Sequence, residues 1–140
     1  MPFILSKGPS VLEYFPKKAS TTLTVNWLAQ FESAAGDVTI CTAAPTRVAG
    51  VMAQTIASTD SDFSGQKKVA VVLPQANNEF LADVTGTLLT THVGTQFAPS
   101  ATGGYVDISN TTTPVIVVVG YISASQALVK FNGAYTFRNA

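Results

Sequence analysis

Apolar and polar residues alternate over short segments along most of the chain, which is the period of a β-strand. In residues 79–85, for example, Phe80, Ala82 and Val84 fall on one side of the predicted strand. Residues 69–73 are apolar on both sides, which is typical of a strand buried inside a closed or two-layered structure. These patterns predict strands over residues 22–31, 38–42, 48–56, 69–73, 79–85, 105–108, 115–122, 127–131 and 134–137.

Turn residues separate these segments, and no helical pattern is longer than two turns. Asn77 and Asn78 supply turn chemistry between two of the predicted strands. Thr90 and Gly94 are expected to cap a one-turn helix, and Asn132-Gly133 is a hairpin-type dipeptide. Eight or nine short strands separated by turns predict an all-β fold, either a compact β-barrel or a sandwich.

Three details refine the expected core. The alternation of residues 22–31 places Trp27 on the inward face, as the anchor of that strand. Gly50 indicates a bulge or a close approach of another backbone. Residues 115–122 form the most apolar segment, so that strand is expected to be filled on both faces except at Gly120.

Residues 1–22 differ from the rest of the chain and predict an extended N-terminal arm ahead of a single domain at 23–140. Pro2, Pro9 and Pro16 recur at even spacing, and neither a strand nor a helix period survives across them. The arm is nevertheless too apolar for a solvated tail. It is expected either to fold back over its own domain or to reach a neighbouring subunit, and deletion of residues 1–18 is expected to leave the domain folded.

Composition narrows the classes of partner. Charged residues make up 11% of the 140 residues, the formal net charge is zero and the mean hydropathy is +0.29. So little charge indicates buried interfaces and a homo-oligomer. The charges form no basic stripe, which argues against nucleic acid, and the longest apolar run, residues 115–119, is shorter than the about 20 residues of a membrane span. The first ten residues lack the features of a secretory signal.

No residue pattern predicts catalysis, a metal or a cofactor. His92 is the only histidine and is expected to be a surface or capping residue, and Cys41, the only cysteine, a small buried one. Asp60 and Asp62 lack the further ligands of a calcium loop and are interpreted as turn residues. Glu79 and Asp83 would lie roughly 13 Å apart along one strand, too far for a glycosidase pair. We therefore predict that the protein is not an enzyme and has no small-molecule substrate.

Aromatic residues allow a second interpretation. Trp27, Tyr105, Tyr121 and Tyr135 could stack on a sugar beside an exposed loop at Gly103-Gly104, as in a lectin-like carbohydrate-binding module. Scattered one per strand, however, such residues are more typical of cores and interfaces. An enzyme with a diffuse site is a third, weaker hypothesis.

Five segments carry a resemblance to a known class of protein. They are Ala49–Val51, Asp60–Phe63, Val69–Pro74, Asn78–Val84 and Thr90–Gly94. Their run of strand, polar turn, strand and short T-x-x-V-G turn resembles the decoration, or cement, proteins on the capsids of tailed bacteriophages. The likeness spans roughly residues 45 to 132, and the arm carries no matching motif.

The resemblance implies a compact barrel or tulip-like fold that assembles as a homotrimer. Such trimers bind the major capsid protein at three-fold and quasi-three-fold positions on the outer surface of the virion, after synthesis in the host cytoplasm. Another minor virion component, such as a head-fibre base, fits the same resemblance. In the arm, where no motif matches that family, we expect the apolar residues to contact the capsid or a neighbouring subunit, namely Phe3, Ile4, Leu5, Tyr14 and Phe15.

Overall fold

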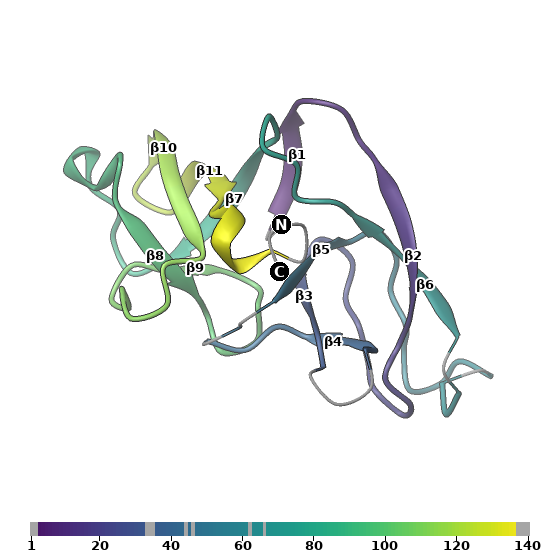
Figure 1. Cartoon of the computed structure of the whole chain (residues 1–140). Helices are drawn as coiled ribbons and strands as arrows, with labels where there is room; N and C mark the ends of the chain where they lie inside the picture. The colour runs from purple at the N-terminus through teal and green to yellow at the C-terminus, as the bar shows by residue number, and fades with distance from the viewer. Residues whose placement is uncertain are drawn as a thin grey trace.

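The computed structural model describes residues 3–32, 36–43, 45, 47–61, 63–65 and 67–136, and it has an all-β fold built from two sheets (Figure 1). The first sheet contains β1 (Phe3–Lys7), β7 (Glu79–Thr85), β8 (Gln96–Pro99), β9 (Val106–Asp107), β10 (Ile116–Ser123) and β11 (Gln126–Phe131). The second contains β2 (Leu12–Pro16), β3 (Leu28–Phe31), β4 (Val38–Ile40), β5 (Val48–Met52) and β6 (Lys68–Val72). Two single-turn 3-10 helices complete the described elements, η1 (Thr90–His92) and η2 (Gly133–Tyr135).

The first sheet closes into a five-stranded barrel. Its strand order is β1-β7-β11-β10-β8-β9, and an additional parallel pairing of β7 with β9 joins the ends of the series β7-β11-β10-β8-β9. Strand β7 is long enough to pair with both β1 and β9, through residues 79–82 and residues 84–85 respectively. The choice between barrel and sandwich, which the sequence left open, is therefore a barrel for this sheet.

The second sheet is antiparallel throughout, in the order β2-β6-β5-β3-β4. An isolated parallel bridge between Lys17 and Val38 brings the end of β2 close to β4, the other outer strand. Close approach of two strands inside this sheet requires Gly50, which has φ +148°. A Cβ there would overlap the carbonyl oxygen of Val72, so the predicted close approach at Gly50 is confirmed.

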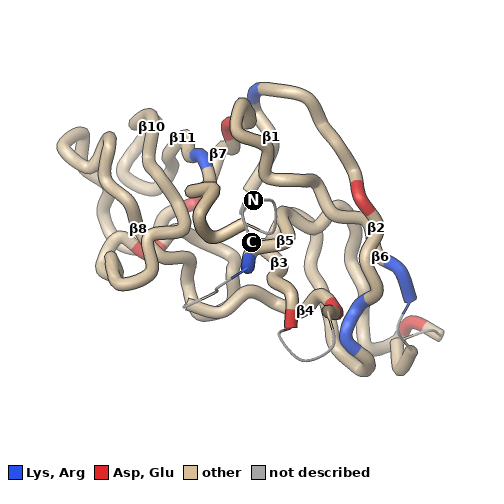
Figure 2. The backbone as a smooth tube through the Cα atoms, in the orientation of Figure 1, with Lys and Arg blue, Asp and Glu red and all other residues tan. Residues whose placement is uncertain are grey.

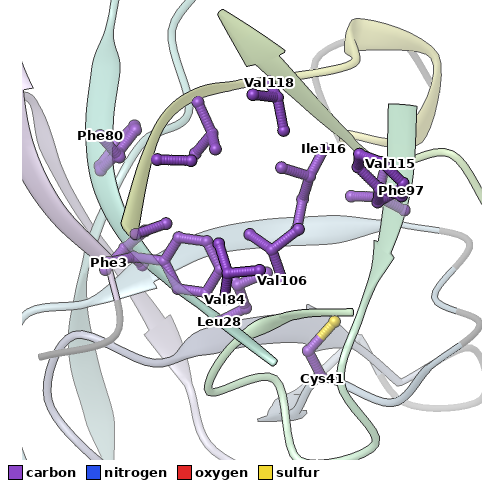
Figure 3. Packing of buried hydrophobic residues seen from close by; sticks show 14 of the residues in the cluster. Phe3, Leu28, Cys41, Phe80, Val84, Phe97, Val106, Val115, Ile116 and Val118 are labelled. Atoms are coloured by element: carbon purple, nitrogen blue, oxygen red, sulfur yellow. The ribbon is translucent and has the colours of Figure 1, made fainter. Parts of the chain in front are cut away.

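Two apolar clusters form the core, and the larger one includes Leu28, Val48 and Val51 of the second sheet as well as residues of the barrel. The larger cluster fills the barrel, where Phe131 packs against Phe3 and Phe80 with ring centroids 5.7 and 5.2 Å apart. Figure 3 shows this cluster, with Phe3 reaching in from β1 and Cys41 at its edge. The smaller cluster lies against the second sheet and contains Leu23, Ala29, Val38, Ala49, Met52, Ile56, Val69 and Val71. The alternation predicted for residues 79–85 is confirmed, because every second residue of β7 is buried.

The N-terminal residues fold back over their own domain, which is one of the two expected alternatives, but they do so as paired strands that contribute to the core and not as a separate extended arm. Strand β1 pairs with β7, and β2 pairs with β6, so residues 3–16 form an outer strand of each sheet. The two strands run antiparallel to the connected strands β6 and β7, and Gly8 sits at the crossing with φ +101°. A Cβ at Gly8 would overlap Oδ1 of the buried Asn78. Proline breaks the period of these residues without preventing short strands on either side of the break.

Several predicted strands are shorter than expected, for local reasons. Residues 22–31 do not form one strand, because Asn26 adopts φ +70° and the Trp27 N–H donates to Thr24 O in a turn. Trp27 is therefore half-buried rather than a core anchor. The predicted final strand, residues 134–137, does not form: Ala134 and Tyr135 belong to the helix η2, where the Asn132 side chain accepts the Ala134 N–H. Thr136 makes only an isolated parallel bridge with Val48, and Phe137 lies outside the described residues.

Candidate interaction surface

The outer edge of β2 is the clearest open edge in the part of the chain that the structure describes. Strand β2 has β6 on one side, and no described strand pairs with its other side over Leu12–Pro16. At the two ends of this ladder, the Leu73 N–H donates to Val11 O at 2.9 Å and the Lys17 N–H donates to Lys67 O at 2.9 Å. Antiparallel ladders use alternate residues, so odd-numbered residues of β2 bond to β6. The backbone groups of Leu12 and Tyr14 therefore point away from the sheet.

Side chains on this strand also alternate. Phe15 packs against the smaller cluster, with its ring edge-on to Phe31 at 5.0 Å. Leu12 and Tyr14 occupy the opposite face and are 46% and 56% exposed, and Val11 just before them is also exposed. Leu12 and Tyr14 thus present both backbone hydrogen-bonding groups and apolar side chains to the outside. We call Val11, Leu12 and Tyr14 the β2 edge.

The five arm residues predicted to contact a partner are divided by the structure. Phe3 is fully buried in its own barrel, so it is not available as a contact residue, and this prediction is corrected. Leu5 and Phe15 are partly buried against the two clusters. Ile4 and Tyr14 are exposed. The five residues differ in exposure because β1 pairs with β7 and β2 pairs with β6, which gives each of the two strands one inward and one outward face.

Val11 and Leu12 were not among the predicted contact residues. The spacing could have identified Leu12, because it lies two residues before Tyr14 and therefore on the same face of a strand. Beyond this edge, Pro16 removes one backbone donor, and the Lys18 N–H donates to Val38 O. The open edge is therefore short, and it ends where the chain closes against β4.

Lys17 is a buried cation that sequence reasoning missed. Its side chain is fully buried, and Nζ donates to Phe63 O at 2.6 Å and to Lys18 O at 3.0 Å. Nζ also lies 5.1 Å from the centre of the Phe63 ring. Lys17 thereby ties the polar loop around residue 63 to the end of β2, and its role in this arrangement is structural.

His92 acts as a capping residue, as predicted. Its Nδ1 accepts a hydrogen bond from the Leu89 N–H at 3.0 Å, and its ring meets Phe97 edge-on at 5.6 Å. The N-cap of η1 is Leu89 rather than the predicted Thr90, whereas Gly94 does adopt a left-handed conformation with φ +89°. A ring nitrogen held by its own helix turn is poorly placed to serve as a general base.

Cys41 is buried in the barrel cluster, as predicted. Burial raises the pKa of its thiol to about 12, and a hydrogen bond to the Thr42 carbonyl accompanies this burial. The thiolate is the reactive form of cysteine. Near neutral pH this thiol is therefore an apolar packing group rather than a nucleophile.

The acidic residues for which we considered a site accept hydrogen bonds from a backbone N–H or from a neighbouring side chain. Asp60 accepts the Ala57 N–H at 2.9 Å, which confirms its role in a turn, and Asp62 lies outside the described residues. Asp83 accepts from the Gln126 side chain at 3.3 Å across the β7–β11 pair. Among the described residues, no group of three or more histidine, cysteine or acidic side chains could hold a metal ion.

The structure does not gather the aromatic residues into the platform that a lectin-like module would use. Trp27 and Tyr105 lie together, with ring centroids 6.4 Å apart, but Tyr121 lies on β10 and Tyr135 packs against the barrel cluster. The expected exposed loop at Gly103-Gly104 is buried, because a Cβ at Gly104 would meet the Trp27 ring at 3.1 Å. One face of the indole is therefore already covered by backbone.

Comparisons with known proteins add no relative. No family model matches the chain, and a search of curated proteins found no match. Among the described residues, no helix has the length and apolar character that crossing a membrane requires.

Proposed function

We propose that the protein is a structural component of a virus particle that binds the outside of the capsid and stabilises the joints between capsid subunits. The observation that carries the proposal is the β2 edge, where Leu12 and Tyr14 direct both side chains and backbone groups outward. An extended segment of the major capsid protein can pair with such an edge as an added strand. Backbone hydrogen bonds then supply affinity, and the outward side chains supply specificity.

Two further features support this role. The low charge of the chain favours burial of surface in an assembly. Its segments also resemble those of capsid decoration proteins, which implies a homotrimer. Three linked β2 edges bind with avidity, because the second and third attachments become intramolecular. A short edge that binds weakly by itself can hold capsid subunits together when three copies act at once.

Co-sedimentation with capsid shells of the particle that carries this chain tests the proposal. Tyr14→Ala removes an exposed aromatic side chain and keeps the backbone N–H, whereas Tyr14→Pro also removes the outward N–H. The bond pattern to β6 uses the odd-numbered residues, so neither variant removes a ladder hydrogen bond within the chain. We expect Tyr14→Ala to weaken shell binding by at least about tenfold and Tyr14→Pro to weaken it further.

Tyr105→Ala is the matched control, because Tyr105 is an exposed tyrosine outside the β2 edge. It should bind shells as the wild type does. Equal binding by wild type and both Tyr14 variants would contradict the proposal. Electron microscopy of the particle then decides between a decoration protein at three-fold positions and another minor virion component, such as a head-fibre base.

A further inference from the structure

A second group of large apolar side chains is exposed at one end of the barrel. Val119, Tyr121 and Ile122 are on β10, and Leu89 and Val93 flank the helix η1. We call these five residues the β10–η1 face. Isolated exposed apolar residues are normal on protein surfaces, whereas a contiguous group marks an interaction site.

Hydrogen bonds bring together the two segments that carry the five residues. The Leu88 N–H donates to Ala124 O at 2.8 Å, and the Gly94 N–H donates to Val118 O at 2.7 Å. The segment between residues 88 and 94 is thus joined at both ends to the stretch of β10 that carries the exposed side chains. The backbone that carries Leu89 and Val93 therefore runs next to the half of β10 that carries Val119, Tyr121 and Ile122.

Two irregularities turn the side chains of β10 outward. The register of β10 against β11 shifts between Val118 and Gly120, and again between Tyr121 and Ser123. A bulge interrupts the alternation of a strand and redirects the residues after it. The prediction that β10 is filled on both faces is consequently wrong for its second half: Ile116 and Val118 are buried, and the residues from Val119 to Ile122 are not.

The part of the chain that carries this face contains few charged residues. After Asp83 the sequence contains three charged residues, Asp107, Lys130 and Arg138, of which Arg138 lies outside the described residues. Figure 2 shows most of the charged positions over the second sheet and around β1, and fewer on the barrel, among them an acidic one beside β8 and a basic one between β11 and β7. A charged partner surface would lose its hydration here without gaining a counter-charge, which is unfavourable. The occupant must therefore be as neutral and apolar as the face itself.

We propose that the β10–η1 face is the contact between copies of this chain. A second copy offers a surface of matching neutrality, and closed oligomers form when such a face meets its equivalents around a symmetry axis. Figure 1 shows β10 and β2 at opposite ends of the molecule, so copies joined through this face leave each β2 edge open. The inference rests on the proposed function only for the number of copies, since the capsid-binding form is expected to be a trimer.

Light scattering coupled to size exclusion tests the inference through two matched variants. Ile122→Glu and Leu12→Glu each place a carboxylate at an apolar position of similar exposure, 48% and 46% respectively. Wild type and Leu12→Glu should both elute at a multiple of the 14.6 kDa chain mass. Ile122→Glu should elute at the mass of one chain. Leu89→Lys, in the η1 segment, should also elute at the mass of one chain. Because it lies outside β10, the same result in this variant shows that dissociation does not come from misfolding of β10.

The outcomes separate this inference from the proposed function. A wild type that is monomeric at every concentration reached overturns the inference, as does dissociation by Leu12→Glu but not by Ile122→Glu. Flotation of monomeric wild type with phosphatidylcholine vesicles also overturns it, because the occupant is then a bilayer. A wild-type dimer that Ile122→Glu dissociates supports the face and contradicts the three-fold part of the proposed function. A variant that no longer binds shells but keeps the oligomeric mass of the wild type bears on the β2 edge alone.

Discussion

The β2 edge and the β10–η1 face expose similar apolar side chains, yet they differ in what accompanies those side chains. The β2 edge belongs to the sheet that carries most of the charge, and it offers outward-pointing backbone groups that no described strand pairs, with the Tyr14 N–H reaching only the neighbouring Glu13 side chain at 3.4 Å. The β10–η1 face lies in the part of the chain with few charged residues, and its segment at residues 88–94 is hydrogen-bonded at its two ends, to Ala124 and Val118. Strand addition needs the first kind of surface, whereas side-chain packing between equal copies needs the second.

This difference shows why exposed apolar area alone does not identify a partner. Open backbone groups favour a partner that arrives as an extended segment. A bonded backbone leaves side-chain burial as the main contribution, which is roughly proportional to apolar area and has no direction. We therefore assign hetero-association to the β2 edge and self-association to the β10–η1 face.

The largest effect is expected from removing the strand that carries the β2 edge. Deletion of residues 1–18 takes away an outer strand of both sheets, Phe3 from the barrel and the buried Lys17. In contrast to the expectation from sequence, we predict that the truncated chain loses its cooperative thermal unfolding transition, measured by circular dichroism. A sharp transition near that of the full chain would show that the β2 edge is separable from the core.

Substitutions on β1 should show that its buried residue stabilises the fold and that its exposed residue does not. Phe3→Ala should lower the free energy of unfolding by about 3–5 kcal/mol, because it empties a fully buried aromatic site. Ile4→Ala, at the exposed neighbouring position, should change it by no more than about 0.5–1 kcal/mol. Urea unfolding measures both values. Equal losses would mean that β1 does not hold the register described for it.

Alkaline pH should lower the stability of the fold that carries both surfaces, because it acts on Cys41 in the barrel cluster. Burial raises the pKa of the Cys41 thiol from its ordinary value of 9.0 to about 12 in the folded chain. The stabilising contribution is present below pH 9 and is lost as pH rises through the folded pKa, by about 1.4 kcal/mol for each unit above 9. Urea unfolding between pH 8 and pH 10.5 should show this slope, and Cys41→Ala should lack it.

Sulfate should distinguish the two surfaces by a smaller effect. Excluded salts of this kind strengthen the burial of apolar surface. Self-association through the β10–η1 face should therefore tighten several-fold when sodium sulfate replaces sodium chloride at equal ionic strength, as measured by analytical ultracentrifugation. Self-association that weakens instead would indicate a polar or charged contact between copies.

The smallest effects concern stability at the two surfaces themselves. Tyr14→Ala and Tyr121→Ala remove exposed side chains from outer faces, so each should change the free energy of unfolding by no more than about 0.5 kcal/mol. Differential scanning calorimetry provides the check. A large loss in either variant would mean that its effect on binding or assembly reports unfolding rather than contact.

Local sequence patterns were sufficient to predict the structure where one face of a strand packs against the core and the other is more exposed. The alternation of residues 79–85 identified β7 with its inward residues, and the left-handed Gly94 and the capping His92 followed from local chemistry. Prediction failed where neighbours change the outcome. Trp27 lies in a turn despite an alternating pattern, and Gly104 is buried beneath its ring. The exposed half of β10 depends on register shifts against β11, which a single strand does not encode.

The sequence by itself determined that this chain folds as short β-strands, carries little charge and has no recognisable catalytic pattern, because these properties belong to single residues and to a period of two. Tertiary structure alone decided that the first sheet closes as a barrel, that Phe3 fills it, and that Leu12 and Ile122 face outward at opposite ends. The physical reason is that closure, strand order and register arise from pairing between distant segments. The apolar face of a strand can pack either against its own chain or against a partner, and the strands with which it pairs determine which of the two occurs.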